Sequence, residues 1–294
     1  MKEKINLAVL GGDQRQIVMA RTLAEYGYPV KVWGLGRCRN EIGDAKYCES
    51  WEHAILDAEA VILPLPASAD GVRIHCPLHD GDVFLRVTTL LDSIGGKRLL
   101  GGRLGESFRS IAEQKRVEWS DYYESEILQL KNALPTAEGA IAIAMQELPV
   151  TIDGVSAVIT GYGRIASLLA EKLRALGADV TVYARRSEQL TLASLHHHKA
   201  KRLTTESGES ALSALPRDCR VVFNTVPHRL FTREILRKLP QKCILIDLAS
   251  APGGIDHVAA SELGLRSVWG TALPGKCTPE SAGRFIAEAL IELL

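Results

Sequence analysis

Residues Gly161 to Ala166 carry the pattern that most directly indicates chemistry, the hexapeptide Gly-Tyr-Gly-Arg-Ile-Ala. An apolar run over residues 157–160 precedes it, and apolar residues spaced as on a helix follow it as far as Gly177. This order predicts a strand, a tight turn and a helix. In such a turn the first glycine permits the sharp change of direction, and the second lets the backbone approach a pyrophosphate held on free helix amides. The pattern favours dinucleotide binding over a purely structural turn.

The second strand of this unit, over residues 179–183, indicates which dinucleotide binds. NAD-binding domains usually place Asp or Glu about 20 residues after the glycines, where it binds the ribose 2′-hydroxyl. Here the strand is followed by Ala184, Arg185, Arg186 and Ser187, with no carboxylate. Guanidinium groups bind phosphate oxygens and can stack on adenine. The sequence therefore favours NADP(H) over NAD(H), and the alternative is a solvated basic turn.

Two later strands, predicted over residues 220–223 and 243–247, should end beside the same cofactor. Backbone groups and small side chains at the carboxyl ends of parallel strands contact the nicotinamide half of a dinucleotide. The predicted cofactor-binding residues are Gly161, Tyr162, Gly163, Arg164, Ile165, Ala184, Arg185, Arg186, Ser187, Asn224, Thr225, Val226, Pro227, Leu248, Ala249 and Ser250.

A second strand-turn-helix pattern opens the chain, with an apolar strand over residues 5–10 followed by Gly11-Gly12-Asp13. This turn lacks the spacing of the first, so we interpret the N-terminal part as the substrate domain. Two further strands are predicted over residues 60–63 and 97–100; the first ends in a proline-bounded turn as far as Ser68. Proline cannot extend a strand ladder, and strand ends of this kind line clefts in open α/β sheets.

The apolar stretch over residues 134–148 predicts a helix that connects two domains, with Thr136 as its N-cap and Glu138 in its first turn. We therefore expect an α/β protein in which two Rossmann-like βαβ domains with parallel sheets are joined by connecting helices around a cleft. The predicted divisions are a substrate and catalytic domain over 1–133, a connecting helix over 134–149, an NADP-binding Rossmann domain over 150–275 and a C-terminal helix over 276–294 that packs back toward the first domain. The connecting helix would place Thr136 beside substrate.

The composition limits the classes of partner. Lys plus Arg and Asp plus Glu number 35 each in 294 residues, so no global field attracts nucleic acid or an anionic membrane, and an anionic ligand needs a local cluster of cations. No apolar run approaches the roughly 20 residues of a membrane span, and we expect a cytoplasmic protein.

The six cysteines lack metal-site spacing, and we expect them to be reduced thiols. We interpret residues 196–198, all histidines, as a solvated helix end and predict no metal site.

Several longer motifs occur in order along the chain. They are INLAVLGGDQRQ at 5–16, ILPLPAS at 62–68, LPTAEGAIAIAMQ at 134–146, GYGRIA with YARRS, then NTVP, DLASAPGG and LPGKCTPESAG at 273–283. With these motifs the chain resembles the dipicolinate synthase A subunit, the dehydrogenase component of that enzyme in spore-forming Gram-positive bacteria. The likeness covers nearly the whole length.

The resemblance implies NADP-linked oxidation of a dihydrodipicolinate-type precursor, itself derived from the lysine-pathway product 4-hydroxytetrahydrodipicolinate, to pyridine-2,6-dicarboxylate during sporulation. It also implies a mother-cell location and a flavoprotein-like partner, the dipicolinate synthase B subunit; the chain itself could form a homo-oligomer. Removing a hydride and a proton from a dihydropyridine gives an aromatic ring, so the protein mainly has to position that ring against the nicotinamide.

A dicarboxylate substrate calls for local cations and hydroxyls. The predicted substrate-binding residues are Arg15, Ser68, Arg103 and Lys276, and the predicted catalytic residues are Thr136, Glu138 and Asp13. Asp13 or Glu138 would accept the proton, although a capping role for Thr136 and Glu138 is equally open. The histidines at 75, 79 and 228 are further candidate bases, and no sequence spacing favours one of them over the others.

Two alternative functions are open at this stage. One is another two-domain NADP oxidoreductase that resembles shikimate or methylene-tetrahydrofolate dehydrogenases, although the Lys-Asp pair expected of the shikimate type is not found as a motif. The other is a non-catalytic NADP-binding component, with activity residing in the flavoprotein-like partner. Turnover by the isolated chain would separate them.

Overall fold

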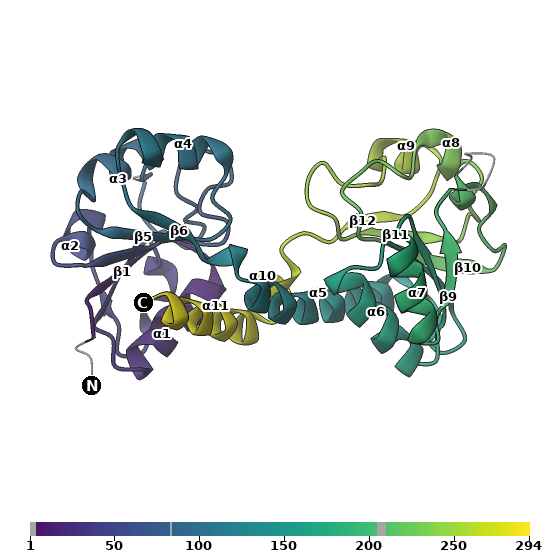
Figure 1. The fold of residues 1–294 in the computed structure, drawn as a ribbon, viewed down its shortest axis with the longest axis horizontal. Coiled ribbons are helices and arrows are strands. Elements are labelled where there is room, and N and C mark those ends of the chain that lie inside the picture. Colours follow the sequence, from purple (N-terminus) through teal and green to yellow (C-terminus); the bar gives the residue numbers. More distant parts are fainter. Residues whose placement is uncertain (1–3, 83, 205–209) are drawn as a thin grey trace. The chain divides into compact units, whose positions relative to one another are not determined.

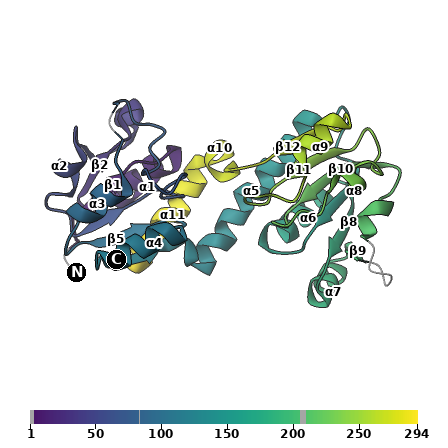
Figure 2. The same ribbon diagram turned by 90° about the horizontal axis from the view of Figure 1, so that it is seen from above.

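The computed structural model describes residues 4–82, 84–204 and 210–294, and the chain divides into two compact units. Unit 1 comprises residues 1–132 and 278–294, and unit 2 comprises residues 133–277. Each unit contains one six-stranded parallel sheet with helices on both faces (Figure 1, Figure 2). The predicted fold class, α/β with two Rossmann-like parallel-sheet domains, is confirmed.

The sheet of unit 1 has the order β3-β2-β1-β4-β5-β6. Its strands are β1 (Leu7–Leu10), β2 (Val30–Trp33), β3 (Lys46–Tyr47), β4 (Ala60–Ile62), β5 (Arg98–Gly101) and β6 (Trp119–Asp121). Its helices are α1 (Gln14–Glu25), α2 (Trp51–Ile55), α3 (Val87–Ser93), α4 (Glu106–Gln114) and α11 (Pro279–Leu293), with 3-10 turns η1 (Gly36–Glu41) and η2 (Tyr122–Glu124). All four residues of β1 are buried because α1 and α11 pack on one face of the sheet and α2, α3 and α4 on the other.

The sheet of unit 2 repeats this topology in the order β12-β11-β10-β7-β8-β9. Its strands are β7 (Ser156–Thr160), β8 (Asp179–Ala184), β9 (Lys199–Arg202), β10 (Cys219–Asn224), β11 (Ile244–Asp247) and β12 (Ser267–Trp269). Its helices are α6 (Arg164–Ala175), α7 (Ser187–Leu195), α8 (Arg233–Leu236), α9 (His257–Glu262) and α10 (Leu273–Cys277), with the 3-10 turn η3 (Ala211–Ala214). In both units the strand order reverses beside the first strand, and ligands of such sheets bind at that switch point.

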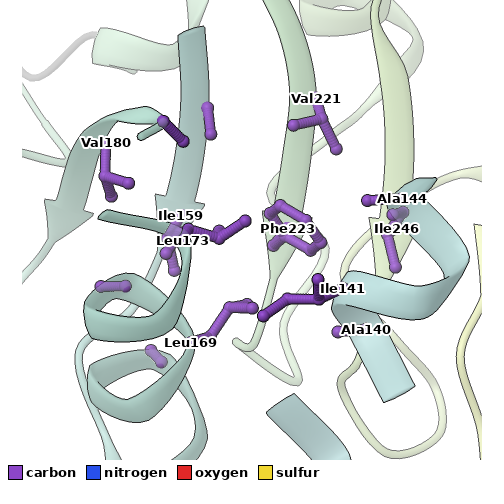
Figure 3. Close-up of a cluster of buried hydrophobic side chains, with 14 of the residues drawn as sticks. Ala140, Ile141, Ala144, Ile159, Leu169, Leu173, Val180, Val221, Phe223 and Ile246 are labelled. Atoms are coloured by element: carbon purple, nitrogen blue, oxygen red, sulfur yellow. The ribbon is translucent and has the colours of Figure 1, made fainter. Parts of the chain in front are cut away.

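One face of the unit 2 sheet is covered by α6 and by the second half of α5 (Glu126–Glu147). Figure 3 shows Ile141 of α5 and Leu169 of α6 pointing toward Phe223 of β10, and Phe223 is fully buried. The opposite face packs against α8 and α9. This core fixes the strands whose carboxyl ends form the candidate cofactor site.

The predicted start of the connecting helix is wrong. Helix α5 begins at Glu126, and Thr136 lies inside it, one residue after the internal Pro135. Ser125 precedes the helix, and its hydroxyl accepts a hydrogen bond from the Leu128 amide, which is the capping role predicted for Thr136. Proline inside a helix removes an amide donor, but packing of the residues on either side maintains the helix through Pro135.

A smaller expectation, the solvated helix end over residues 196–198, also differs from the structure. His198 is buried beneath Tyr162, whereas His196 and His197 are exposed at the end of α7. Of the helices in the described part of the chain, none combines the length and apolarity needed to cross a bilayer.

Candidate functional site

The glycine turn of unit 2 lies at the switch point between β7 and β10. Gly161 has φ +88°, a conformation that favours glycine, and a Cβ there would lie 2.6 Å from the Thr225 Oγ1 atom. Thr225 in turn donates through both its amide and its hydroxyl to the Thr160 carbonyl, at 3.2 and 2.8 Å. Gly161 therefore permits the close approach of the two strand ends that flank the site.

Gly163 is the N-cap of α6, and it leaves the start of that helix open. Among the residues that the structure describes, none has an atom within 4 Å of a Cβ placed on Gly163, and none caps the helix with its side chain. The first turn of α6 begins at residue 164, and the first amides of a helix point outward from its end. These features fit a diphosphate, which needs free amides and space beside them.

Helix α1 of unit 1 starts after the corresponding strand, but its amides are already satisfied. The Asp13 side chain accepts from the Arg15 amide, and Gln16 completes a capping box. A carboxylate thus occupies the place where α6 would receive a phosphate. This contrast supports assigning the dinucleotide to unit 2.

The predicted basic turn follows β8, with Arg186 as the N-cap of α7 and Ser187 as its first residue. Arg185, Arg186 and Ser187 are exposed, whereas Ala184 is buried at the strand end. Among the residues that the structure describes, no carboxylate forms an ion pair with Arg185 or Arg186. Both arginines are therefore exposed at the carboxyl end of β8.

One predicted cofactor residue, Asn224, serves the scaffold through its side chain. Asn224 is fully buried: its Oδ1 atom accepts from the Thr160 hydroxyl at 2.7 Å, and its amide donates to Asp247 at 2.7 Å and to the Val226 carbonyl at 3.0 Å. Asp247, which the sequence analysis did not single out, is fully buried and also accepts from the amides of Ala249, Gly254 and Ile255. The sequence signal that could have indicated a role for Asp247 was its position at the end of a strand, shortly before a pair of glycines.

The remaining predicted residues lie near this network, and they differ in exposure. Val226 and Leu248 are partly or fully buried, and Pro227 and Ser250 are exposed. Tyr162 is buried with its hydroxyl 2.9 Å from His196 Nδ1, so its side chain supports the turn. The structure therefore gathers the predicted cofactor residues at the carboxyl ends of β7, β8, β10 and β11.

In unit 1 the structure brings Asp13 and Arg15 together at the corresponding switch point. The Arg15 guanidinium contacts both Asp13 carboxylate oxygens, with Nη2 to Oδ2 at 2.8 Å, and donates to the Leu65 carbonyl in the turn after β4. The Arg15 side chain keeps only 5% exposure. Burial raises the pKa of Asp13, but the contacts with Arg15 outweigh it and lower the pKa below its usual value. Asp13 is therefore a poor proton acceptor, and Arg15 holds two loops together.

His75 is the histidine that the structure places in this region. Its amide donates to the Ala67 carbonyl at 3.0 Å and its carbonyl accepts from the Gly12 amide at 2.8 Å, which fixes it between the loops after β1 and β4. Burial lowers the pKa of His75, Asp13 opposes this shift and Arg15 reinforces it. The imidazole is neutral near pH 7, in the form that accepts a proton.

Arg103 lies at the adjacent strand end and has an unusual backbone. It follows β5, its side chain is exposed, and its φ of +55° lies in the region that disfavours residues with a Cβ. Asp121 holds this conformation by accepting from the amides of Arg103 and Leu104 at 2.8 and 2.7 Å. Strained backbone held by neighbouring groups is concentrated at functional sites.

The other predicted substrate and catalytic residues are placed differently. The Ser68 hydroxyl bonds to Asp70 at 3.2 Å and accepts from the Gly71 amide at 2.9 Å, in the loop after β4. Glu138 is exposed in the interior of α5 and pairs with Lys172 at 3.0 Å, while Thr136 is buried in the same helix. Lys276 is exposed on α10 of unit 2. Of the predicted substrate and catalytic residues, Asp13, Arg15, Ser68 and Arg103 share the carboxyl edge of the unit 1 sheet.

Comparisons with known proteins test the predicted resemblance. Residues 6–123 match the family model that describes the N-terminal domain of the dipicolinate synthase A subunit. The dipicolinate synthase A subunit of Bacillus subtilis strain 168 is 28% identical over 295 residues, which cover 99% of this chain and 96% of that protein. The predicted resemblance to the dipicolinate synthase A subunit is confirmed.

Two crystal structures of dipicolinate synthase A subunits show the same architecture. The protein from Bacillus halodurans has a TM-score of 0.87 at 26% identity, covering 98% of this chain and 97% of that one. The protein from Bacillus subtilis has a TM-score of 0.85 at 27% identity, covering 100% and 96%. The likeness to these proteins thus extends through both units.

The second half of the chain matches a dehydrogenase family. Residues 130–255 match the model described as D-isomer specific 2-hydroxyacid dehydrogenase, NAD binding domain. This range contains the glycine turn, the basic turn and the network around Asp247. This match supports an oxidoreductase with a nicotinamide-cofactor domain in unit 2.

Proposed function

We propose that this chain is the NADP-dependent dehydrogenase subunit of a dipicolinate synthase, which oxidises a dihydrodipicolinate-type precursor to pyridine-2,6-dicarboxylate. The observation that carries the proposal is the glycine turn of unit 2, with an open helix start and a basic turn beside it, in a chain that resembles the dipicolinate synthase A subunit throughout. The proposal includes a flavoprotein-like partner, the B subunit, and the cytoplasm of a sporulating mother cell as its location.

The proposed chemistry balances without a metal. The precursor loses a hydride from one ring carbon and a proton from another, and the ring becomes aromatic. Bound NADP supplies the hydride acceptor. We assign the proton to the neutral imidazole of His75 rather than to Asp13, because the ion pair with Arg15 stabilises the ionised Asp13 carboxylate. We assign the binding of a substrate carboxylate to Arg103, an exposed cation of unit 1. Ser68 lies along the same carboxyl edge of the sheet.

Turnover by the purified chain tests the overall proposal. The chain, NADP and the dihydro precursor should yield NADPH and dipicolinate in equal amounts, measured by absorbance and chromatography. NADPH formation only after the flavoprotein-like partner is added would favour the non-catalytic alternative. Binding of NADP without any turnover in the complete complex would exclude the proposed reaction.

The cofactor choice gives the first prediction. Replacing Arg185 or Arg186 by Ala should raise the Kd for NADP about tenfold or more and leave the Kd for NAD nearly unchanged, because a charge-assisted phosphate contact contributes roughly 1.5 to 3 kcal/mol. Fluorescence titration with both dinucleotides measures this. Equal affinity of the parent for NADP and NAD would remove the basis for the NADP assignment.

The substrate site gives the second prediction. Arg103→Ala should raise the Kd for dipicolinate by about tenfold, from the loss of one charged hydrogen bond of roughly 1.5 to 3 kcal/mol. Arg116→Ala is the matched control, because Arg116 is also an exposed arginine with positive φ, +56°, but lies between α4 and β6 at the amino edge of the sheet. Calorimetric titration of dipicolinate at two salt concentrations gives both values. Equal effects of the two substitutions would show a general charge effect and contradict the assignment.

A further inference from the structure

Arg202 is the last residue of β9, and it reaches the basic turn from the neighbouring strand. Strand β9 pairs with β8 so that Arg202 lies opposite Ala184. Its Nη2 atom donates to the Ser187 hydroxyl at 3.1 Å, and its Nη1 atom donates to the Arg185 carbonyl at 3.4 Å. Arg202 is thus oriented by the same two residues that the sequence predicts around a 2′-phosphate.

These contacts concentrate positive charge in one place. Arg185, Arg186 and Arg202 belong to two adjacent strand ends, and all three side chains are exposed. Over residues 4–82, 84–204 and 210–294, none of the three forms an ion pair with a carboxylate. Positive charges gathered at neighbouring strand ends repel one another, and a bound anion offsets that repulsion. The arrangement indicates a doubly charged phosphate rather than a neutral hydroxyl.

We propose that Arg202 is a specificity-determining residue that binds the 2′-phosphate of NADP together with Arg185, Arg186 and Ser187. This inference rests on the proposed NADP-linked function and adds a residue from a second strand. The Arg202 guanidinium has five N–H donors, and the two contacts above use two of them. Because these contacts orient the guanidinium before the ligand arrives, less side-chain freedom is lost on binding.

NAD lacks the 2′-phosphate, so a group that binds this phosphate contributes to NADP affinity alone. A residue with only a structural role in the turn would affect both dinucleotides, since they share adenine, ribose and pyrophosphate. The ratio of the two affinities therefore distinguishes a phosphate contact from a scaffold role. The fragment pair 2′,5′-ADP and 5′-AMP makes the same distinction without the nicotinamide half.

The test compares Arg202→Ala with the matched control Lys199→Ala. Lys199 begins the same strand, its removal changes the net charge equally, and its amine pairs with Asp179 at 2.6 Å at the other end of β8. Calorimetric titration of the full chain with NADP, NAD, 2′,5′-ADP and 5′-AMP gives the affinities. We expect Arg202→Ala to weaken the binding of NADP and 2′,5′-ADP about tenfold or more, with little effect on the binding of NAD and 5′-AMP. Lys199→Ala should change each of the four affinities by less than about twofold.

Each of the other outcomes would contradict either the role of Arg202 or the choice of cofactor. Equal weakening of NADP and NAD by Arg202→Ala, with an unchanged melting temperature, would show that Arg202 supports the turn only. Unchanged NADP affinity in Arg202→Ala, with a parent that still prefers NADP to NAD, would overturn the role of Arg202 and leave the NADP assignment standing. A parent that binds both dinucleotides equally would instead overturn the cofactor proposal itself.

Discussion

Gly163→Val should raise the Kd for NADP by at least about 100-fold while the melting temperature stays close to that of the parent. Gly163 has φ −104° and ψ −163°, extended backbone that valine adopts readily, and its Cβ would point into open space. The added side chain costs roughly 1 kcal/mol at most as an N-cap. In the proposed complex it would occupy the space of the diphosphate, and losing two charge-assisted phosphate contacts corresponds to about 3 kcal/mol or more.

Gly105→Val is the control for this substitution. Gly105 is likewise a helix N-cap with extended backbone, no side-chain cap and open space for a Cβ, but it begins α4 in unit 1. Its replacement should leave NADP affinity unchanged. If Gly163→Val melts like the parent and titrates with NADP as the parent does, the turn is structural and the diphosphate must bind elsewhere.

The cofactor region was predictable because its signals are local in sequence. A strand, two glycines and a helix follow one another within residues 156–175, and the basic turn follows the next strand directly. Arg202 and Asp247 were not found because their roles depend on pairing between strands distant in sequence. Arg202 becomes part of the turn only through the pairing of β9 with β8. Asp247 reaches Asn224 only through the pairing of β11 with β10.

The substrate region was less predictable for the same reason. The motif around Thr136 suggested a helix start, but the 22-residue helix α5 continues through Pro135 because both of its halves are packed. His75 could not be separated from the other histidines, since only the fold places it between two loops at a switch point. A sequence shows that Arg15 follows a glycine turn, but not that Asp13 and Leu65 engage its guanidinium.

Arg15→Ala is expected to destabilise unit 1 by about 3 kcal/mol, in addition to any effect on dipicolinate binding. Removing one partner of a buried ion pair leaves the other charge uncompensated, which typically costs about 3 to 5 kcal/mol; the Asp13 side chain keeps 24% exposure, so we take the lower end. Urea unfolding followed by tryptophan fluorescence measures the change, since Trp33, Trp51 and Trp119 lie in unit 1 and only Trp269 in unit 2.

An exposed ion pair between Arg21, on the same helix as Arg15, and Glu280 of α11 provides the control. Arg21 pairs with Glu280 at 2.8 Å, but both side chains are accessible, and such a surface pair contributes at most about 1 kcal/mol. Arg21→Ala should therefore change the free energy of unfolding much less than Arg15→Ala. Similar losses in the two variants would mean that the Asp13–Arg15 pair does not stabilise the loops after β1 and β4.

The pH dependence of this difference identifies the ion pair as its cause. In the parent the pKa of Asp13 is lower when folded than its ordinary value of 3.8, so the pair stabilises the fold above that pH and the contribution is lost as the pH falls through the folded pKa. In Arg15→Ala the guanidinium contacts that lower the pKa of Asp13 are lost, whereas burial, which raises it, and the hydrogen bond from the backbone amide of residue 15, which lowers it, both remain. The variant therefore depends less than the parent on an ionised Asp13 carboxylate. The gap in unfolding free energy between parent and variant should therefore narrow from about pH 7 to about pH 3. A gap that stays constant over this range would attribute the loss to the missing Arg15 side-chain packing and its bond to Leu65 rather than to the charge on Asp13.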